Sequence, residues 1–306
     1  MMKNSIKKVL CVICLCTLVI SLLGSASFAQ PAFDITKAKQ DLTNRYKSNY
    51  IPMSPEEVKI RAEMIDRQLC KLIAEGKSQI EIDNVMKANK LYKLEVPTNS
   101  NSGMIPLSAP NDAICNSVSI YYDSGASQWV VSGGGWWTTD QWFNDRNWIW
   151  VPYIGETHNV GGYDSVGIAY NNTSGTYNTS VISSMGYITD QDGWGESSDS
   201  PSHGDGSLGV AFDFQDKQKY TRSPVNPVVY SYDVAYQGKG YSALIRYNSN
   251  FANYNGNARV FYAHTWNTCN ITNLSFGAGS GFTFGVDIDF STSNGWKIFT
   301  NSDTSF

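Results

Sequence analysis

The sequence predicts an all-β body, an antiparallel β-sandwich or barrel of about twelve strands, preceded by a small α-helical hairpin. From Ala113 onward, apolar and polar residues alternate in short runs, and clusters of Gly, Asn, Ser and Asp separate these runs. A period of two is typical of strands with one buried face. Before Pro97 the apolar residues recur at helical spacing instead, so helices are expected only in the N-terminal third.

The clearest strand signal is the stretch Phe282–Phe290, which reads Phe-Thr-Phe-Gly-Val-Asp-Ile-Asp-Phe. Alternate side chains of a strand point to opposite faces. One face of this stretch is therefore wholly apolar, and its members are Phe282, Phe284, Val286, Ile288 and Phe290. A glycine-rich turn at 277–281 and a short run at 273–276 precede it, which predicts a β-hairpin.

The N-terminus has the three regions of a secretory signal peptide, which we assign to residues 1–29. A basic region with Lys3, Lys7 and Lys8 precedes an apolar run over 9–23, and Ser27 and Ala29 supply small residues at the cleavage positions. This pattern predicts secretion, with export of the Gram-positive type.

Residues 30–96 form the predicted helical segment. Ser54, Pro55 and two glutamates make a favourable helix start, and Ser78 supplies a second N-cap after Gly76. Two hypotheses fit this segment. It either packs against the β body or is a pro-segment that is removed by cleavage in the Pro/Ser/Asn linker over 97–112.

The aromatic-rich antiparallel β domain is expected over 113–306. Its predicted strands are Val118–Tyr122, Gln128–Ser132, Trp148–Tyr153, Val166–Tyr170, Thr179–Ile188, Leu208–Phe214, Val228–Tyr236, Tyr241–Tyr247, Arg259–Trp266, Ile271–Phe276, Phe282–Phe290 and Trp296–Thr300.

The charge of the β body argues against nucleic acid as a partner. From Thr98 to the C-terminus the chain has eight Lys and Arg residues against seventeen Asp and Glu. An acidic body without a basic stripe argues against nucleic acid as a partner, whereas neutral polysaccharide remains compatible with it.

Three cysteines remain after the signal peptide: Cys70, Cys115 and Cys269. Because Cys115 and Cys269 flank the β-rich region, they are a candidate disulfide in an oxidising compartment. The alternative is that all three are free or buried thiols.

The densest aromatic cluster is a candidate binding patch, composed of Trp136, Trp137, Asp140, Trp142, Trp148 and Trp150. Indole faces stack on sugar rings and the polar neighbours hydrogen-bond hydroxyl groups, so an exposed patch would suit carbohydrate. The same residue types suit a membrane interface, and the cluster could equally be core.

An acidic, glycine-rich loop contains Asp190, Asp192 and Glu196. Hard cations bind carboxylate oxygens, so this loop is a candidate Ca²⁺ site, although its spacing is not that of an EF-hand. We expect no other cofactor. The alternative is a solvated loop without a metal.

No nucleophile motif is present. Ser165 and Ser207 both lack the first glycine of a G-x-S-x-G elbow. A glycan hydrolase would need two carboxyl groups, which Glu156 with Asp140, Asp145 or Asp164 would supply. We therefore expect a protein without catalytic activity and keep hydrolysis as the second alternative.

The function that these patterns favour is a secreted bacterial exoprotein that acts on other cells or on the envelope, bacteriocin-like or toxin-like. A membrane-spanning β-strand needs about nine to eleven alternating residues, which the Phe282–Phe290 stretch provides. Its partners would be the cell envelope and the lipid bilayer, and it would oligomerise only to form a pore. The first alternative is a secreted protein that binds neutral polysaccharide.

Overall fold

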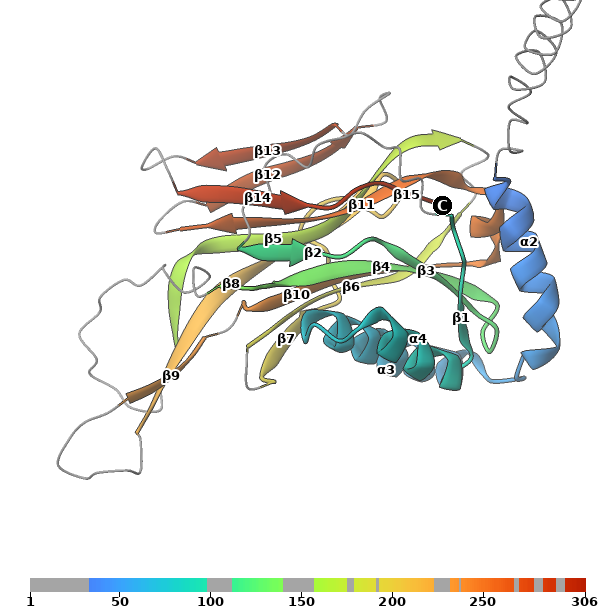
Figure 1. Cartoon of the computed structure of the whole chain (residues 1–306), viewed down its shortest axis with the longest axis horizontal. Coiled ribbons are helices and arrows are strands. Elements are labelled where there is room, and N and C mark those ends of the chain that lie inside the picture. Colours follow the sequence, from blue (N-terminus) through green and yellow to red (C-terminus); the bar gives the residue numbers. More distant parts are fainter. Residues whose placement is uncertain are drawn as a thin grey trace, which may run out of the picture. The chain divides into compact units, whose positions relative to one another are not determined.

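The structure is a computed structural model that describes residues 33–97, 112–139, 157–174, 179–190, 193–222, 232–236, 238–266, 270–277, 283–289 and 295–306. Residues 35–306 form one compact unit, built from two large antiparallel sheets with helices at the N-terminal end of the chain (Figure 1). The predicted fold class is confirmed. No helix of the described residues is long and apolar enough to cross a membrane.

The helical layer consists of α3 (Pro55–Ala74) and α4 (Gln79–Ala88). The first helix, α2 (Ile35–Tyr46), lies apart from them at one end of the sheets (Figure 1), and the 3₁₀ turn η1 (Lys47–Asn49) follows it. Both predicted helix starts are confirmed. Ser54 and Ser78 each form a capping box with the glutamate three residues later, which satisfies backbone N–H groups that have no partner within the helix.

The first sheet, sheet A, has the strand order β1–β3–β4–β10–β6–β7, with β2 paired to one end of β4. The strands are β1 (Leu91–Lys93), β2 (Ala113–Cys115), β3 (Ser119–Asp123), β4 (Gln128–Trp137), β6 (Val181–Thr189), β7 (Gly195–Ser198) and β10 (Gly240–Tyr247). Strand β1 follows the helices in sequence, so the helical segment contributes an edge strand to the β body.

The second sheet, sheet B, has the order β14–β11–β5–β8–β9, with β15 also paired to β11. Its strands are β5 (Thr157–Ser174), β8 (Gly209–Arg222), β9 (Tyr232–Tyr236), β11 (Asn255–Thr265), β14 (Trp296–Thr300) and β15 (Thr304–Ser305), and the 3₁₀ turn η3 (Ser249–Asn253) precedes β11. The short strands β1, β2, β7 and β15 were not predicted. The predicted strand 148–153 lies outside the described residues.

The remaining strands, β12 (Asn270–Gly277) and β13 (Thr283–Asp289), pair only with each other among the described strands. This two-stranded ribbon contains the predicted hairpin. Ile271 and Leu274 of β12 are buried in a cluster with Phe261 and Ala263 of β11. The ribbon therefore covers the outer face of sheet B.

These contacts define four layers: helices, sheet A, sheet B and ribbon (Figure 1). The main core lies between the sheets, where period-two alternation places Val260 and Tyr262 inward while Phe261 and Ala263 point outward. A second cluster lies between the helices and sheet A and includes Leu69 of α3.

Candidate functional site

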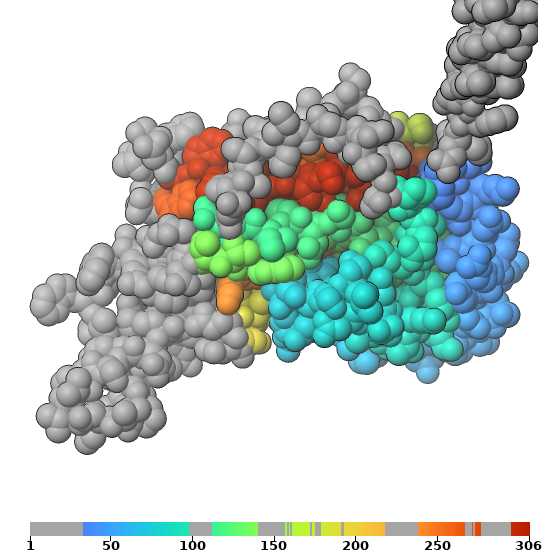
Figure 2. Space-filling view, viewed as in Figure 1, coloured from blue at the N-terminus to red at the C-terminus, as the bar shows by residue number. Residues whose placement is uncertain are grey.

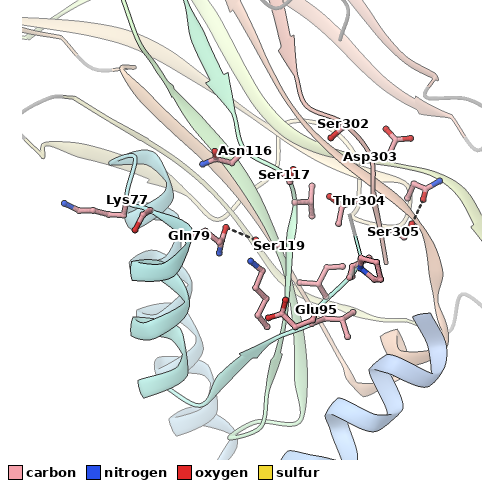
Figure 3. Close-up of a pocket in the computed structure, with 18 of the residues that line it drawn as sticks. Lys77, Gln79, Glu95, Asn116, Ser117, Ser119, Ser302, Asp303, Thr304 and Ser305 are labelled. Carbon is pink, nitrogen blue, oxygen red and sulfur yellow. Dashed lines mark hydrogen bonds between the residues drawn. The ribbon is translucent and has the colours of Figure 1, made fainter. Parts of the chain in front are cut away.

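A polar cleft of about 990 Å³ opens between the helical layer and the C-terminal strands, within the size range of ligand pockets. Four segments of the chain line it: 76–81 at the α3–α4 turn, 93–97 at the end of β1 and after it, 116–120 before and within β3, and 302–305 near the C-terminus. Figure 3 shows amide, hydroxyl and carboxylate side chains from these segments around one hollow. On the surface, the corresponding cyan, green and red segments adjoin one another (Figure 2).

The helical wall is fixed by the way α3 ends. Gly76 adopts a left-handed φ of 69°, and the N–H of Lys77 donates to the carbonyl of Leu72 at 3.1 Å. Glycine adopts this conformation without the strain that a Cβ causes, and the arrangement satisfies carbonyls at the helix end. Ser78 then starts α4 at once, which places Gln79 at the cleft.

Gln79 is held in one orientation by its neighbours. Its Nε2 donates to Asp83 at 2.7 Å and to the Tyr121 hydroxyl at 2.9 Å, and its Oε1 accepts from Ser119 at 3.2 Å. The dashed line between Gln79 and Ser119 in Figure 3 marks the Ser119 bond. A side chain fixed by several bonds loses little entropy when it binds a ligand.

Trp136 is the aromatic residue of the cleft. It is the second-last residue of strand β4, is half-buried, and pairs with Ile114 in the ladder with β2. A Cβ on Gly76 would lie 3.1 Å from the Trp136 ring, so the missing side chain lets the helix end pack directly against the indole. The end of α3 therefore positions the aromatic wall.

The segment between β2 and β3 forms the floor. The backbone N–H of Asn116 donates to Gly134 at 2.7 Å, and its carbonyl accepts from Asn301 at 2.8 Å. Below it, a cavity of about 10 Å³ is lined by Ser119 and Ser132, among others. The buried Ser132 hydroxyl has no hydrogen-bond partner among the described residues, and the cavity is close to the size of one water molecule.

Three charged groups of the cleft lie in ion pairs. Asp303 binds Arg259, Lys93 lies 3.3 Å from Asp83, and Lys77 lies 3.9 Å from a glutamate. Hydrogen bonds from the Ser78 backbone and side chain lower the pKa of Glu81 below its usual value. The cleft therefore suits an uncharged polar ligand better than an ion.

The structure describes two of the six residues of the predicted aromatic patch, and they point in different directions. Trp136 lines the cleft, but Trp137 is 1% exposed and packs in the core against Tyr262 and Phe299. Neighbouring residues of a strand face opposite sides, so the two tryptophans could not share one exposed surface. Asp140, Trp142, Trp148 and Trp150 lie outside the described residues.

The predicted membrane hairpin corresponds to the ribbon. Phe284, Val286 and Ile288 belong to β13, whereas Phe282 and Phe290 lie outside the described residues. Register pairs Phe284 with Phe276, Val286 with Leu274 and Ile288 with Ile271.

No disulfide is seen in the described part of the chain. Cys115 is a free thiol with its sulfur 3.4 Å from the Tyr241 hydroxyl, and Cys269 lies outside the described residues. Cys70 is also free and is buried in α3. Burial raises the pKa of both described thiols to about 12 and leaves them protonated at neutral pH.

The predicted acidic-loop residues are engaged in other contacts. The Asp190 carboxylate accepts the backbone N–H of Trp194 at 2.8 Å, and Glu196 forms an ion pair with Lys217. Asp192 lies outside the described residues. Among the described residues, the group with ligand atoms close enough for a metal is a different one, formed by Asp164, Asp216 and His264.

The carboxyl pair considered for hydrolysis is not assembled in the described residues. Glu156, Asp140 and Asp145 lie outside them. Asp164 is buried and accepts hydrogen bonds from Tyr262 and from the backbone N–H of Thr265, the latter at 2.8 Å.

A comparison of the chain with known protein families and with curated protein sequences finds no match. The cleft itself was missed by the sequence analysis, apart from Trp136.

Proposed function

We propose that this protein is a secreted carbohydrate-binding protein whose cleft holds a neutral saccharide. The observation that carries the proposal is that Trp136 lines the same cleft as Gln79 and Asn116. A sugar ring offers an apolar face to an indole and hydroxyl groups to amides, so these residue types are complementary to it.

Two further features support a saccharide over other ligands. Serine and threonine hydroxyls at 302, 304 and 305 extend the polar lining, and a hydroxyl both donates and accepts hydrogen bonds, as sugar hydroxyls do. Charge does not dominate the lining, because Asp303 and Lys93 are already paired. An anionic or cationic ligand would have to compete with these ion pairs.

The test is binding to a panel of neutral oligosaccharides, followed by calorimetric titration of the best ligand. Trp136→Ala should weaken binding about tenfold, because an aromatic contact contributes about 0.5–1.5 kcal/mol beyond the area that it buries. Trp194→Ala is the matched control, since Trp194 is 41% exposed and does not line the cleft. Equal affinities of the two variants would contradict the proposal.

The ribbon favours membrane damage as a second candidate function. Its strands make no ladder hydrogen bonds with either large sheet among the described strands, and β12 contacts sheet B through Ile271, Leu274 and Phe276. A hairpin that is not paired to a large sheet can leave that sheet without breaking any strand pairing. Lipid would then replace the apolar contacts.

Membrane damage predicts dye release from phosphatidylcholine vesicles by the full chain at micromolar concentration. Leu274→Glu should abolish release, because a charge on the lipid side of a barrel costs about 2–4 kcal/mol. Asn273→Glu is the control, because Asn273 is exposed on the opposite face of β12. Intact vesicles with the wild-type protein would rule out this second function.

A further inference from the structure

A buried polar cluster between the sheets shares no residue with the lining of the cleft. Asp164 on β5, Asp216 on β8 and His264 on β11 are each at most 3% exposed. Each lies two residues from an apolar or aromatic side chain of the main core, so it points into the space between the sheets as that neighbour does. The neighbours are Val166 on β5, Phe214 on β8 and Tyr262 on β11. Three adjacent strands therefore turn from apolar to polar near one end, with His264 beside Asp164 and Asp216 two residues beyond the partner of Asp164 on β8.

The ligand atoms of these residues converge. Nδ1 of His264 lies 2.6 Å from Oδ2 of Asp164 and 3.9 Å from Oδ2 of Asp216, and one ligand atom from each residue lies within 4.8 Å of the other two. All three come from strands of one sheet, so their backbone positions are fixed by ladder hydrogen bonds. We propose that Asp164, Asp216 and His264 form a binding site for one divalent metal ion, Zn²⁺ or Mn²⁺.

The ligand set selects the class of ion. Imidazole nitrogen suits Zn²⁺ and carboxylate oxygen suits Mn²⁺, while two carboxylates supply the negative charge that a divalent cation requires. Ligands around such an ion lie roughly 3.0–3.5 Å apart, given metal–ligand distances of about 2.1 Å. Binding would therefore draw Asp216 inward and widen the contact of 2.6 Å between His264 and Asp164.

A second shell already orients the ligands. The N–H of Thr265 donates to Oδ1 of Asp164 at 2.8 Å, and the Tyr262 hydroxyl donates to Oδ2 of the same carboxylate. Hydrogen-bonded ligand carboxylates of this kind are the usual second shell of metal sites.

Aromatic rings enclose the cluster. The ring of His264 lies 5.0 Å from that of Trp137 and 4.5 Å from that of Trp266, measured between centroids. Gly238 closes another side, because a Cβ there would lie 2.4 Å from Oδ1 of Asp216. An apolar enclosure strengthens the attraction between a cation and its ligands.

The test uses the full mature chain, stripped of metal with a chelator and titrated with Zn²⁺, Mn²⁺ and Ca²⁺. We expect one Zn²⁺ or Mn²⁺ per chain and, at 100 times the dissociation constant, a folding equilibrium shifted about 100-fold toward the native state. His264→Gln and Asp216→Asn should each abolish this binding. Failure of the wild-type protein to bind either ion, or unchanged stoichiometry in folded variants, would overturn the proposal.

A matched control lies on the same sheet. His203 and Asp213 form a second histidine–aspartate pair, with 2.9 Å between Nε2 and Oδ2, but no third ligand group joins it among the described residues. His203→Gln should therefore keep the bound ion. Equal loss of the ion in His203→Gln and His264→Gln would assign the binding elsewhere.

A measurement on the wild-type protein covers the case in which the variants do not fold. Mn²⁺ is paramagnetic and should broaden the indole N–H resonance of Trp137, which contacts His264. Trp129, eight residues earlier on the same strand and about 26 Å away along it, should stay sharp. If the chain binds Mn²⁺ while the Trp137 resonance stays sharp, the ion lies elsewhere and the site is contradicted even without a variant.

Discussion

Arg246 on β10 and Asp66 on α3 form a buried ion pair, with Nε donating to Oδ2 at 2.9 Å. Arg246 is 0% exposed and also binds Asp123 at 2.9 Å. Asp123 in turn binds Arg61 of α3. Two arginines and two aspartates therefore join the helical layer to sheet A in one network.

Removal of one member of this network should lower the free energy of unfolding. Arg246→Met leaves two carboxylates buried beside each other, and loss of one partner of a buried pair typically destabilises by about 3–5 kcal/mol. Arg67→Met is the control, because Arg67 is exposed on the same helix and should change the free energy of unfolding by less than about 0.5 kcal/mol. Urea unfolding measures the free energy of unfolding of both variants. Similar values for the two variants would show that the network contributes little to stability.

The same network bears on the pro-segment hypothesis. After a protease cuts the linker between 97 and 112, we expect the helical fragment to stay bound to the β body, because Leu69 and Met86 are buried between α3, α4 and sheet A. Gel filtration in native buffer should show one peak that contains both fragments. Separate elution of the fragments would instead support a removable pro-segment.

Lys39 should make stability depend on pH. Its ammonium group is buried and donates to the carbonyls of Phe251 at 3.1 Å and Tyr254 at 2.6 Å, and burial lowers its pKa from 10.5 to about 7. Between these two pKa values the unfolded chain binds more protons than the folded chain. Stability should therefore rise with pH in this window, by at most about 1.4 kcal/mol per unit.

Urea midpoints of the wild-type protein and Lys39→Met between pH 7 and 10 isolate this contribution, because all other groups titrate in both. Parallel curves for the two proteins would mean that Lys39 keeps an ordinary pKa.

Trp136 and Trp137 should differ sharply in their effect on stability. Trp137→Ala opens a cavity in the core and should cost about 3–5 kcal/mol, whereas Trp136→Ala at the half-buried cleft should cost about 1 kcal/mol. Thermal unfolding of the two variants checks the difference. Equal costs would place both rings in the core and remove the aromatic wall from the cleft.

Much of the fold follows from local sequence signals. The alternation in β10 and β11, and the serine caps at Ser54 and Ser78, depend on neighbouring residues only, and they predicted the strands and helix starts correctly. Short strands such as β2 and β15 have no such signal, because their pairing with β4 and β11 exists only after the chain has folded.

The sites are harder to predict for the same reason. Gln79, Asn116 and Ser302 are separated by long stretches of sequence and share no periodic pattern, so their convergence at one cleft depends on the packing of α4 and β15. His264 and Asp164 did carry a signal, since both continue an inward alternation. The alternation shows that the two residues are neighbours only when the pairing of β5 with β11 is known.

The most direct test of the carbohydrate-binding proposal is calorimetric titration of the wild-type chain and its Trp136→Ala variant with one neutral oligosaccharide found on the panel. The account predicts saturable binding by the wild-type protein at one site per chain and roughly tenfold weaker binding by the folded variant. A chain that binds no neutral saccharide, or a variant that binds as tightly as the wild-type protein, would contradict it.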